Sequence, residues 1–359
     1  MHSSSNMNRD SKARAVNKGG ILVVVTLTGV VVAAIFSLIT FGFNYVALTK
    51  AIILGTLISF VSGYFELFVF PRMTKNMKFI SILIAKTLFY VLVISIPTLL
   101  LWIIHESMVN SEGFFETLTG EDFRRFIFTG DFRIIVIFSF TAGFLLNLFA
   151  QISSLIGRKV FLNYLSGKYN KPKEEERTFM FLDLTSSTAI AEKLGSIAYH
   201  KFMNACFYDI DGPIVETKGE IYQYVGDEVI VSWIGEKAFV NNNCIECFFG
   251  IKLVLNELRD KYLAEFGVEP FFKGGIHTGP VVAGEIGDSK KEIVFHGDVL
   301  NTASRIQAKC KEVDSDLLIS ENVQMRLSKA IDYAVEELGE FALKGKSQKI
   351  RLFTVSLIK

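Results

Sequence analysis

Four long apolar stretches in the first 157 residues constrain this chain more than any other feature. They are residues 19–49, 51–70, 79–104 and 134–157. Two of the four contain no charge, while the second contains only Glu66 and the third only Lys86. Each reaches the roughly 20 apolar residues that a helix needs to cross a bilayer. The first is too long for a cleaved signal peptide. The sequence therefore predicts an N-terminal all-α membrane domain with four transmembrane helices over residues 19–157.

The charges between the stretches predict the orientation. Basic side chains lie before the first stretch, between the second and third, and after the fourth: Arg9, Lys12, Arg14, Lys18, Arg72, Lys75, Lys78, Arg158, Lys159 and Lys168. The segment 105–133 is instead rich in Glu and Asp. Because positive loops stay in the cytoplasm, we expect an integral protein of the inner or plasma membrane with both termini and the C-terminal half cytoplasmic. Segment 105–133 would face outward, where its aromatic residues either anchor on the membrane surface or bind a ligand.

Glu66 and Lys86 are the two charges within the stretches, each near the cytoplasmic end. Opposite charges at similar depth on neighbouring helices can form an ion pair. Alternatively, each side chain extends to the interface independently. Both alternatives stay open at the level of the sequence.

Composition limits the rest of the chain. The 359 residues suffice for two domains, and half of them are hydrophobic. The net charge of +1 gives no overall basic signal, so we expect no nucleic-acid partner. The cysteines fall in the expected cytoplasmic half, where thiols stay reduced. They are Cys206, Cys244, Cys247 and Cys310. The pair Cys244 and Cys247 lies in a helical pattern without a second pair, which favours two helix-face cysteines over a zinc knuckle.

These observations predict four segments. They are a cytoplasmic tail (1–18), the transmembrane domain (19–157), a helical and charged linker (158–177) and a C-terminal domain (178–359). In the last segment, strands are expected at 178–184, 220–225, 228–233, 271–277, 281–286, 293–295, 317–320, 333–337 and 350–355. Helices are expected at 187–194, 198–216, 238–266 and 299–309. This order predicts an α+β, ferredoxin-like domain whose sheet is mostly antiparallel, with the helices on one face.

The first strand of this domain ends in an acid. Asp183 closes an apolar run, and Thr185, Ser186, Ser187 and Thr188 follow it before a helix. A carboxylate can hold Mg²⁺, and the N–H groups of a turn at a helix start can hold phosphate. The alternative is an ordinary turn or N-cap residue. Asp227 lies in Gly226-Asp227, a tight hairpin signal between two strands. If that hairpin neighbours the first strand, the two carboxylates converge and require cations between them.

A third polar group begins the helix at 299–309. Asp298 is expected to act as its N-cap. Asn301 and Arg305 are four residues apart and share one helix face. An amide and a guanidinium on one face suit the stabilisation of charge on a phosphoryl group.

Together these segments resemble the class III nucleotide cyclases, the adenylate and guanylate cyclase catalytic domain. The matching residues are 181–188 (FLDLTSST), 226–228 (GDE), 275–287 (GIHTGPVVAGEIG), 297–305 (GDVLNTASR) and 343–346 (LKGK). The resemblance covers about residues 175–358.

The resemblance implies roles for these residues. Asp183 and Asp227 would bind two Mg²⁺ or Mn²⁺ per site, assisted by the Leu184 carbonyl. The turn Thr185, Ser186, Ser187 and Thr188 would hold the triphosphate, and Lys344 or Lys346 would reach its outer phosphates. Asn301 would orient the ribose, and Arg305 would neutralise the transition state. The family divides these groups between two chains, so the resemblance implies a homodimer with two shared sites.

The sequence departs from the family at the purine-selecting positions. Gln223 and Val294 stand where adenylate cyclases commonly have Lys with Asp or Thr and guanylate cyclases have Glu with Cys. Gln223 can donate and accept hydrogen bonds, whereas the Val294 side chain can do neither. We expect ATP as the substrate and cyclic AMP as the product, in signal transduction. The alternatives are a guanylate cyclase acting on GTP and a catalytically silent membrane receptor or scaffold.

Overall fold

A computed structural model describes residues 3–74, 77–328, 333–343 and 349–358. The chain divides into two compact units, Met1–Leu162 and Asn163–Lys359, which we describe separately.

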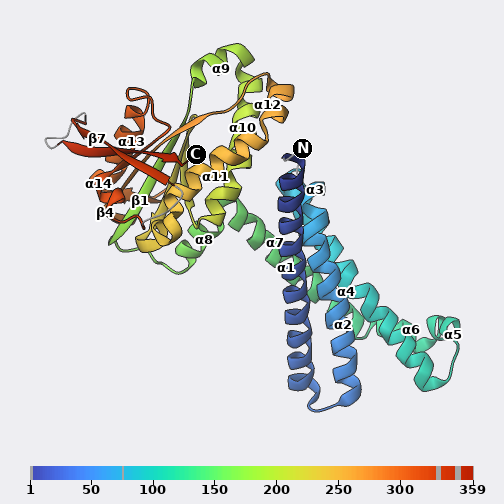
Figure 1. Cartoon of the computed structure of the whole chain (residues 1–359). Helices are drawn as coiled ribbons and strands as arrows, with labels where there is room; N and C mark the ends of the chain where they lie inside the picture. Colours follow the sequence, from blue (N-terminus) through green and yellow to red (C-terminus); the bar gives the residue numbers. More distant parts are fainter. Residues whose placement is uncertain (1–2, 75–76, 329–332, 344–348, 359) are drawn as a thin grey trace. The chain divides into compact units, whose positions relative to one another are not determined.

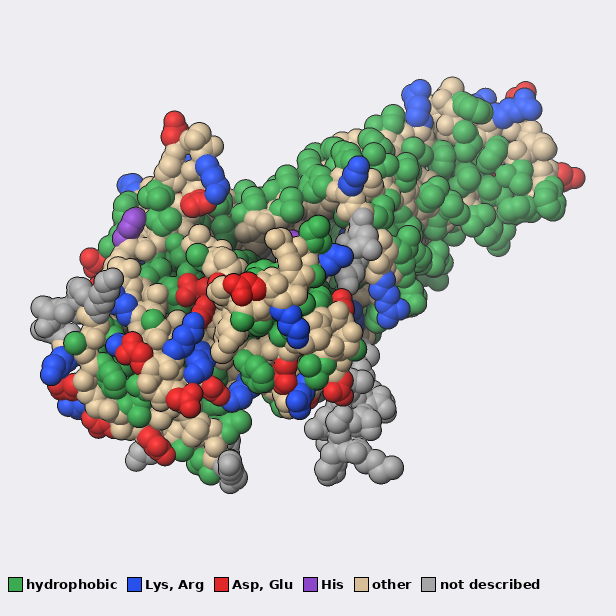
Figure 2. Space-filling model, turned by 90° about the horizontal axis from the view of Figure 1, so that it is seen from above, with side chains coloured by type: hydrophobic (Ala, Val, Ile, Leu, Met, Phe, Trp, Pro, Cys, Tyr) green, Lys and Arg blue, Asp and Glu red, His purple; other side chains and the backbone are tan. Residues whose placement is uncertain are grey.

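The first unit is helical and apolar. Its long helices are α1 (Ser3–Phe41), α2 (Tyr45–Tyr64), α4 (Phe79–Asn110) and α7 (Asp131–Ile156). In the described part of the chain, four spans are long and apolar enough to cross a membrane. They are Lys18–Phe41, Tyr45–Met73, Phe79–Asn110 and Glu121–Ile156. On the face shown in Figure 2, hydrophobic side chains cover most of this unit. The predicted number of apolar helices is therefore confirmed.

The first predicted stretch, 19–49, is wrong at its C-terminal end. Helix α1 stops at Phe41, and α2 already begins at Tyr45. Gly42 takes a φ of +63°, a conformation that suits glycine because it lacks a Cβ. Asn44 then caps α2, since its Oδ1 accepts a hydrogen bond from the Ala47 N–H at 3.1 Å. Residues 45–49 thus belong to the second helix.

Glu66 and Lys86 form the ion pair that the sequence left open. Helix α2 is followed by a π-helical turn, Phe65–Val69, and by the short helix α3 (Phe70–Met73). Glu66 lies in this turn, and Lys86 Nζ on α4 donates to both of its carboxylate oxygens, at 2.9 and 2.8 Å. The Tyr90 hydroxyl donates to Oε1 at 2.6 Å. The two charges therefore do not extend to the interface independently.

Segment 105–133 is largely helical. Helix α4 continues to Asn110, and two short helices follow, α5 (Phe114–Thr119) and α6 (Glu121–Phe128). Phe126 stacks on Trp102 of α4, with the ring centroids 4.3 Å apart. Phe115 and Phe128 are exposed. The aromatic residues of this segment thus divide between packing and exposure.

The second unit is built on one sheet of eight strands (Figure 1). The strands are β1 (Lys173–Leu184), β2 (Glu220–Val225), β3 (Glu228–Ile234), β4 (Phe272–Ile286), β5 (Glu292–His296), β6 (Leu317–Ser320), β7 (Tyr333–Phe341) and β8 (Ile350–Leu357). Their order is β2-β3-β1-β4-β6-β8-β7, and β5 pairs with β4. Only the β4–β6 pairing is parallel among the described strands. The predicted α+β, ferredoxin-like fold with a mostly antiparallel sheet is confirmed.

Helices cover both faces of this sheet, which corrects the expectation of one face. The main helices are α9 (Ser187–Leu194), α10 (Ser196–Glu216), α11 (Asn243–Glu257), α12 (Arg259–Phe266) and α13 (Asp298–Lys309), and the short α14 is Glu321–Gln324. Met180 and Leu182 of β1 share an apolar cluster with α10 and α11. Phe179 and Phe181 point the other way and pack against α13. Because strand side chains alternate, the consecutive apolar residues 179–182 of β1 require a cover on each side.

One helix and one strand of this unit are divided differently from the sequence prediction. The helix expected at 238–266 begins only at Asn243, because Asn241 and Asn242 take positive φ values, and it is also interrupted at Leu258. The strands expected at 271–277 and 281–286 form the single strand β4. Pro280 does not break it, since it lies where β6 has ended and β5 has not begun. Its missing N–H therefore costs no ladder hydrogen bond on that side.

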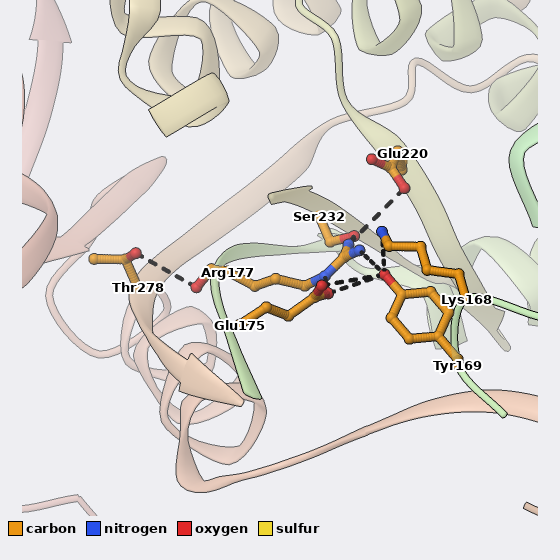
Figure 3. A network of polar contacts seen from close by, with 7 residues as sticks. All are labelled: Lys168, Tyr169, Glu175, Arg177, Glu220, Ser232 and Thr278. Carbon is orange, nitrogen blue, oxygen red and sulfur yellow. Dashed lines mark hydrogen bonds and ion pairs between the residues drawn. The ribbon is translucent and has the colours of Figure 1, made fainter. Parts of the chain in front are cut away.

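The charged run 173–177, expected in the linker, begins β1 (Figure 3). Arg177 is 2% exposed, and its guanidinium contacts Glu175, Ser232 and the Tyr169 hydroxyl. Tyr169 itself is buried, and its carbonyl accepts from the Glu285 N–H at 3.1 Å. These partners satisfy the charge of Arg177 inside the fold, which the sequence alone does not reveal.

All four cysteines are buried and free. Burial raises the pKa of each thiol to about 12. The expectation of free thiols is confirmed.

Candidate active site

Asp183 lies near the C-terminal end of β1, in the middle of the sheet. It is opposite Glu228 of β3 on one side and Lys273 of β4 on the other. The residues before it are buried, whereas its own carboxylate is 19% exposed. The strand thus carries one carboxylate out of the core to an accessible edge of the sheet, which is formed by the ends of its strands. The next residue, Leu184, is buried.

Asp227 reaches the same edge from the β2–β3 hairpin. Val225 pairs with Glu228, so Gly226 and Asp227 are the two turn residues. Gly226 has a φ of +64°, as a tight hairpin requires at this position. Because Asp183 is in register with Glu228, the adjacent Asp227 lies beside it. The predicted convergence of the two carboxylates therefore follows from strand register.

The carboxylates also affect the pKa of Glu228. Burial, together with the negative charges of Asp183 and Asp227, raises its pKa to about 7. Burial, followed by Asp227, Cys206 and Asp183, also raises the pKa of Tyr199 at the start of α10. A hydroxyl and three carboxyl groups thus meet at this edge.

The turn after β1 leads directly into the N-terminus of α9. The Thr185 N–H donates to the Phe271 carbonyl at 2.7 Å, which fixes the start of the turn. Ser186 has a φ of +59° and precedes α9, which starts at Ser187. The first N–H groups of a helix have no partner within the helix. The N–H groups of Ser187 and Thr188 therefore have no acceptor within α9 and could donate to an anion.

A lysine that sequence reasoning missed contacts Asp183. Lys311 lies just after α13, and its Nζ is 3.1 Å from Asp183 Oδ2. No motif surrounds Lys311 in the sequence. Its position depends on how the chain after α13 returns to the sheet.

The donor set fits a divalent metal bound together with phosphate. Within the residues that the structure describes, no group of three or more His, Cys, Asp or Glu side chains is placed to hold a metal ion. Two carboxylates and a main-chain carbonyl leave coordination positions for water and phosphate oxygens. Magnesium sites that share their ion with a substrate phosphate are built in this way.

Asn301 and Arg305 lie on α13, on the opposite face of the sheet from α10 and α11. Thr302, Ala303 and Ile306 of this helix are buried, whereas Asn301 is exposed and Arg305 half-buried. The helix starts one residue earlier than expected. Gly297 is its N-cap, and Asp298 is its first residue, accepting a hydrogen bond from Thr302 Oγ1 at 3.2 Å. An acid in the first turn is favourable there because of the helix dipole.

Gln223 and Val294 lie on β2 and β5, which approach each other across one face of the sheet. The neighbouring rings of Tyr222 and Phe295 are 5.0 Å apart. Gln223 is exposed and Val294 half-buried. This contact joins residues next to the two predicted purine positions, rather than Gln223 and Val294 themselves. Lys344 and Lys346, the predicted partners of the outer phosphates, lie outside the described residues.

Comparison with known families decides the family of this chain. The family model described as "Adenylate and Guanylate cyclase catalytic domain" matches residues 169–356, more than half of the chain. The chain belongs to this cyclase family. The resemblance to class III nucleotide cyclases seen in the sequence is confirmed.

Relatives and solved structures give the cyclase domain its context. Adenylate cyclase 2 of Rhizobium meliloti (strain 1021) is 33% identical over 206 residues, which are 57% of this chain and 57% of that protein. An adenylate cyclase of Anabaena cylindrica is 26% identical over 188 residues, 50% of this chain and 36% of that protein. A bacterial light-regulated adenylyl cyclase has a TM-score of 0.51 at 23% identity, covering 59% of this chain and 63% of that one, which supports the fold. The chain spans little more than half the length of the first of these relatives.

Proposed function

We propose that this protein is a membrane-anchored adenylate cyclase that converts ATP into cyclic AMP and pyrophosphate for intracellular signalling. The convergence of Asp183 and Asp227 beside the turn before α9 carries the proposal. The apolar helices would hold the chain in the inner or plasma membrane, with both termini and the cyclase domain in the cytoplasm. The charge distribution of the loops supports this orientation.

Asp183, Asp227 and the Leu184 carbonyl would hold two Mg²⁺ or Mn²⁺ ions. When bound, such ions make the ribose 3′-hydroxyl a better nucleophile and neutralise phosphate charge. The N–H groups of Thr185, Ser186, Ser187 and Thr188 would hold the triphosphate. Lys344 or Lys346 would add positive charge at the outer phosphates.

Asn301 and Arg305 would complete the reaction geometry. Asn301 would orient the ribose so that its 3′-oxygen faces the α-phosphorus. The 3′-oxygen gives its proton to water and bonds to that phosphorus, while the bond to the bridging oxygen breaks and pyrophosphate leaves with its electron pair. Charge accumulates on the α-phosphoryl oxygens during this exchange, and the Arg305 guanidinium is suited to neutralise it.

Helix geometry supports a site shared between two chains. Lys311 contacts Asp183 from just beyond the C-terminal end of α13. Asn301 lies eight residues before Lys309, the last residue of α13, and therefore about 12 Å away along the axis. One chain's Asn301 is thus displaced from its own metal carboxylates. In a homodimer, Asn301 and Arg305 of one chain would act at the carboxylates of the other, giving two sites.

ATP is the proposed substrate. Gln223 can hydrogen-bond either purine edge, and Val294 offers no side-chain hydrogen bond. Neither position carries the Glu and Cys pair typical of guanylate cyclases. The 33% identical relative is named an adenylate cyclase, which supports the same choice.

The test is an assay of the purified full chain with Mn²⁺ and either ATP or GTP, quantifying both cyclic nucleotides. We expect cyclic AMP from ATP at the higher rate, and loss of product in Asp183→Asn. A higher rate with GTP would identify a guanylate cyclase instead. Absence of both products in a folded protein that binds nucleotide would indicate a silent receptor or scaffold.

A further inference from the structure

The carboxylate of Asp183 already has a cationic partner within its own chain. Lys311 Nζ lies 3.1 Å from its Oδ2, with the lysine side chain 59% exposed and the aspartate side chain 19% exposed. Among the described residues, Lys311 is the salt-bridge partner of this carboxylate. The pair joins the segment after α13 to the end of β1.

Several contacts hold this segment in place, so the lysine does not reach Asp183 by its own flexibility alone. Lys273 of β4 stands in register with Asp183, and its Nζ donates to the Cys310 carbonyl at 3.3 Å. The same ammonium group is 3.5 Å from Asp314. The Cys310 thiol donates to the Gly274 carbonyl at 3.2 Å. The backbone on either side of Lys311 is therefore held beside the start of β4, next to the carboxylates proposed to bind metal.

The charges at this edge explain why a cation is useful there. Asp183, Asp227 and Glu228 lie close together, and like charges at short range repel one another. Lys273 faces the same edge, but its ammonium is paired with Asp314. Lys311 is thus the charge that offsets the carboxylate repulsion at Asp183 when no metal is bound.

We propose that Lys311 is a resident counter-ion of the metal site, which a divalent cation must displace from Asp183 in order to bind. The proposal rests on the proposed function, because it takes Asp183 as a metal ligand. An ammonium group and a metal ion cannot both stay on one carboxylate oxygen without strong repulsion. Because Lys311 is more than half exposed, it can rotate into solvent when the ion arrives. Lys311 then sets how much free metal the cyclase needs, without being a ligand or touching the substrate.

The experiment measures Mn²⁺ binding to the full chain in detergent, with MnCl₂ alone as the probe. The free ion is followed by electron paramagnetic resonance after the protein has been treated with chelator. Lys311→Met removes the charge and keeps most of the side chain, and Lys311→Gln is a second neutral variant. Lys311→Arg keeps the charge. The matched control is Lys309→Met, because Lys309 lies at the end of the same helix and pairs with Glu312 at 2.6 Å.

We expect both neutral Lys311 variants to bind Mn²⁺ about two- to fivefold more tightly than the wild type, the range of a half-exposed ion pair. Lys311→Arg and Lys309→Met should bind as the wild type does. The melting temperature of Lys311→Met should be lower than that of the wild type without metal, and should equal it at saturating Mn²⁺. A role in packing alone would not tighten metal binding.

Unchanged or weaker Mn²⁺ binding in both neutral variants would overturn the proposal. The wild type and Asp183→Asn separate that failure from a failure of the proposed function. If Asp183→Asn abolishes Mn²⁺ binding, the metal site stands and only the role of Lys311 is lost. If Asp183→Asn binds Mn²⁺ as the wild type does, both the metal assignment and the counter-ion proposal are wrong.

Discussion

Lys86 Nζ lies 2.8 Å from Glu66 Oε2 and joins α4 to the π-helical turn after α2. The Tyr90 hydroxyl binds the same carboxylate, so three side chains form one polar group in an apolar unit. Ionisable groups within membrane helices are rare, and they persist where a partner compensates for the lost water.

Removing either member of this pair should destabilise the protein. We expect Glu66→Gln or Lys86→Met alone to cost about 1–2 kcal/mol, the upper range for polar contacts between membrane helices. The exchange Glu66→Lys with Lys86→Glu should restore most of the loss. Thermal unfolding in detergent measures all three variants, with Lys50→Met as an unrelated charge removal in α2. Neutral single variants would show that the pair contributes nothing.

The two aspartates should each be indispensable for turnover. Asp183→Ala and Asp227→Ala should leave less than about a tenth of the cyclic AMP production, because both metal ions depend on each carboxylate. Asp183 lies near the end of its strand and Asp227 in a turn, so the melting temperature should change little. Asp316→Ala, which removes an exposed aspartate paired with Lys252, is the control. Activity well above a tenth in either variant would contradict the two-metal assignment.

Two inactive chains should complement each other. Asp183→Ala and Arg305→Ala should each be nearly inactive alone, whereas a mixed dimer contains one site with both lesions and one intact site. With random pairing, activity should recover to about a quarter of wild type, as the two-fold symmetry requires. Co-expression with two different affinity tags measures both activity and dimer formation. Mixed dimers without activity would mean that each site is built within one chain.

Base selectivity should respond to the purine positions. Gln223→Lys combined with Val294→Asp introduces the pair common in adenylate cyclases and should sharpen the preference for ATP. One well-placed polar contact contributes about 1–3 kcal/mol of discrimination. The ratio of kcat/KM for ATP and GTP is the measurement, and Val225→Thr, which changes an exposed residue near the β2–β3 turn, is the control. An unchanged ratio in the double variant would count against this assignment of the purine pocket.

The contribution of Glu228 to the stability of the metal-free protein should fall as the pH rises from about 4.5 to about 7. Glu228 has a pKa of about 7 in the fold, above its ordinary value of 4.5. Between these values Glu228 binds a proton in the folded chain but not in the unfolded chain. Raising the pH therefore lowers the free energy of unfolding. Melting temperatures from pH 5 to pH 8 with chelator present measure the effect. Glu228→Gln should flatten this part of the profile, and a slope equal to that of the wild type would be the contrary result.

The sequence predicted the parts of the site that are encoded locally. Asp183 ends a buried strand, and Asp227 lies in a two-residue turn, so each position is visible in a short window of residues. Strand register then brings them together, as expected. Lys311 was not predictable in this way, because its contact with Asp183 arises only when the chain after α13 returns to β4. Arg177 was misplaced for a similar reason. The five consecutive charged residues 173–177 resemble a solvated linker, and only the fold shows that Tyr169 and Ser232 contact the guanidinium.

The burial of Tyr169 determines where this protein can be joined to other modules. Its side chain is 1% exposed, although it precedes β1 by four residues. A fusion that begins at β1 would remove the Tyr169 phenol and leave the buried guanidinium of Arg177 without one of its partners. An engineer who wishes to place the cyclase under a different sensor should therefore make the joint before Asn163. The same constraint applies to any natural exchange of N-terminal domains in such chains, because the segment before β1 is part of the folded cyclase domain and not of the linker.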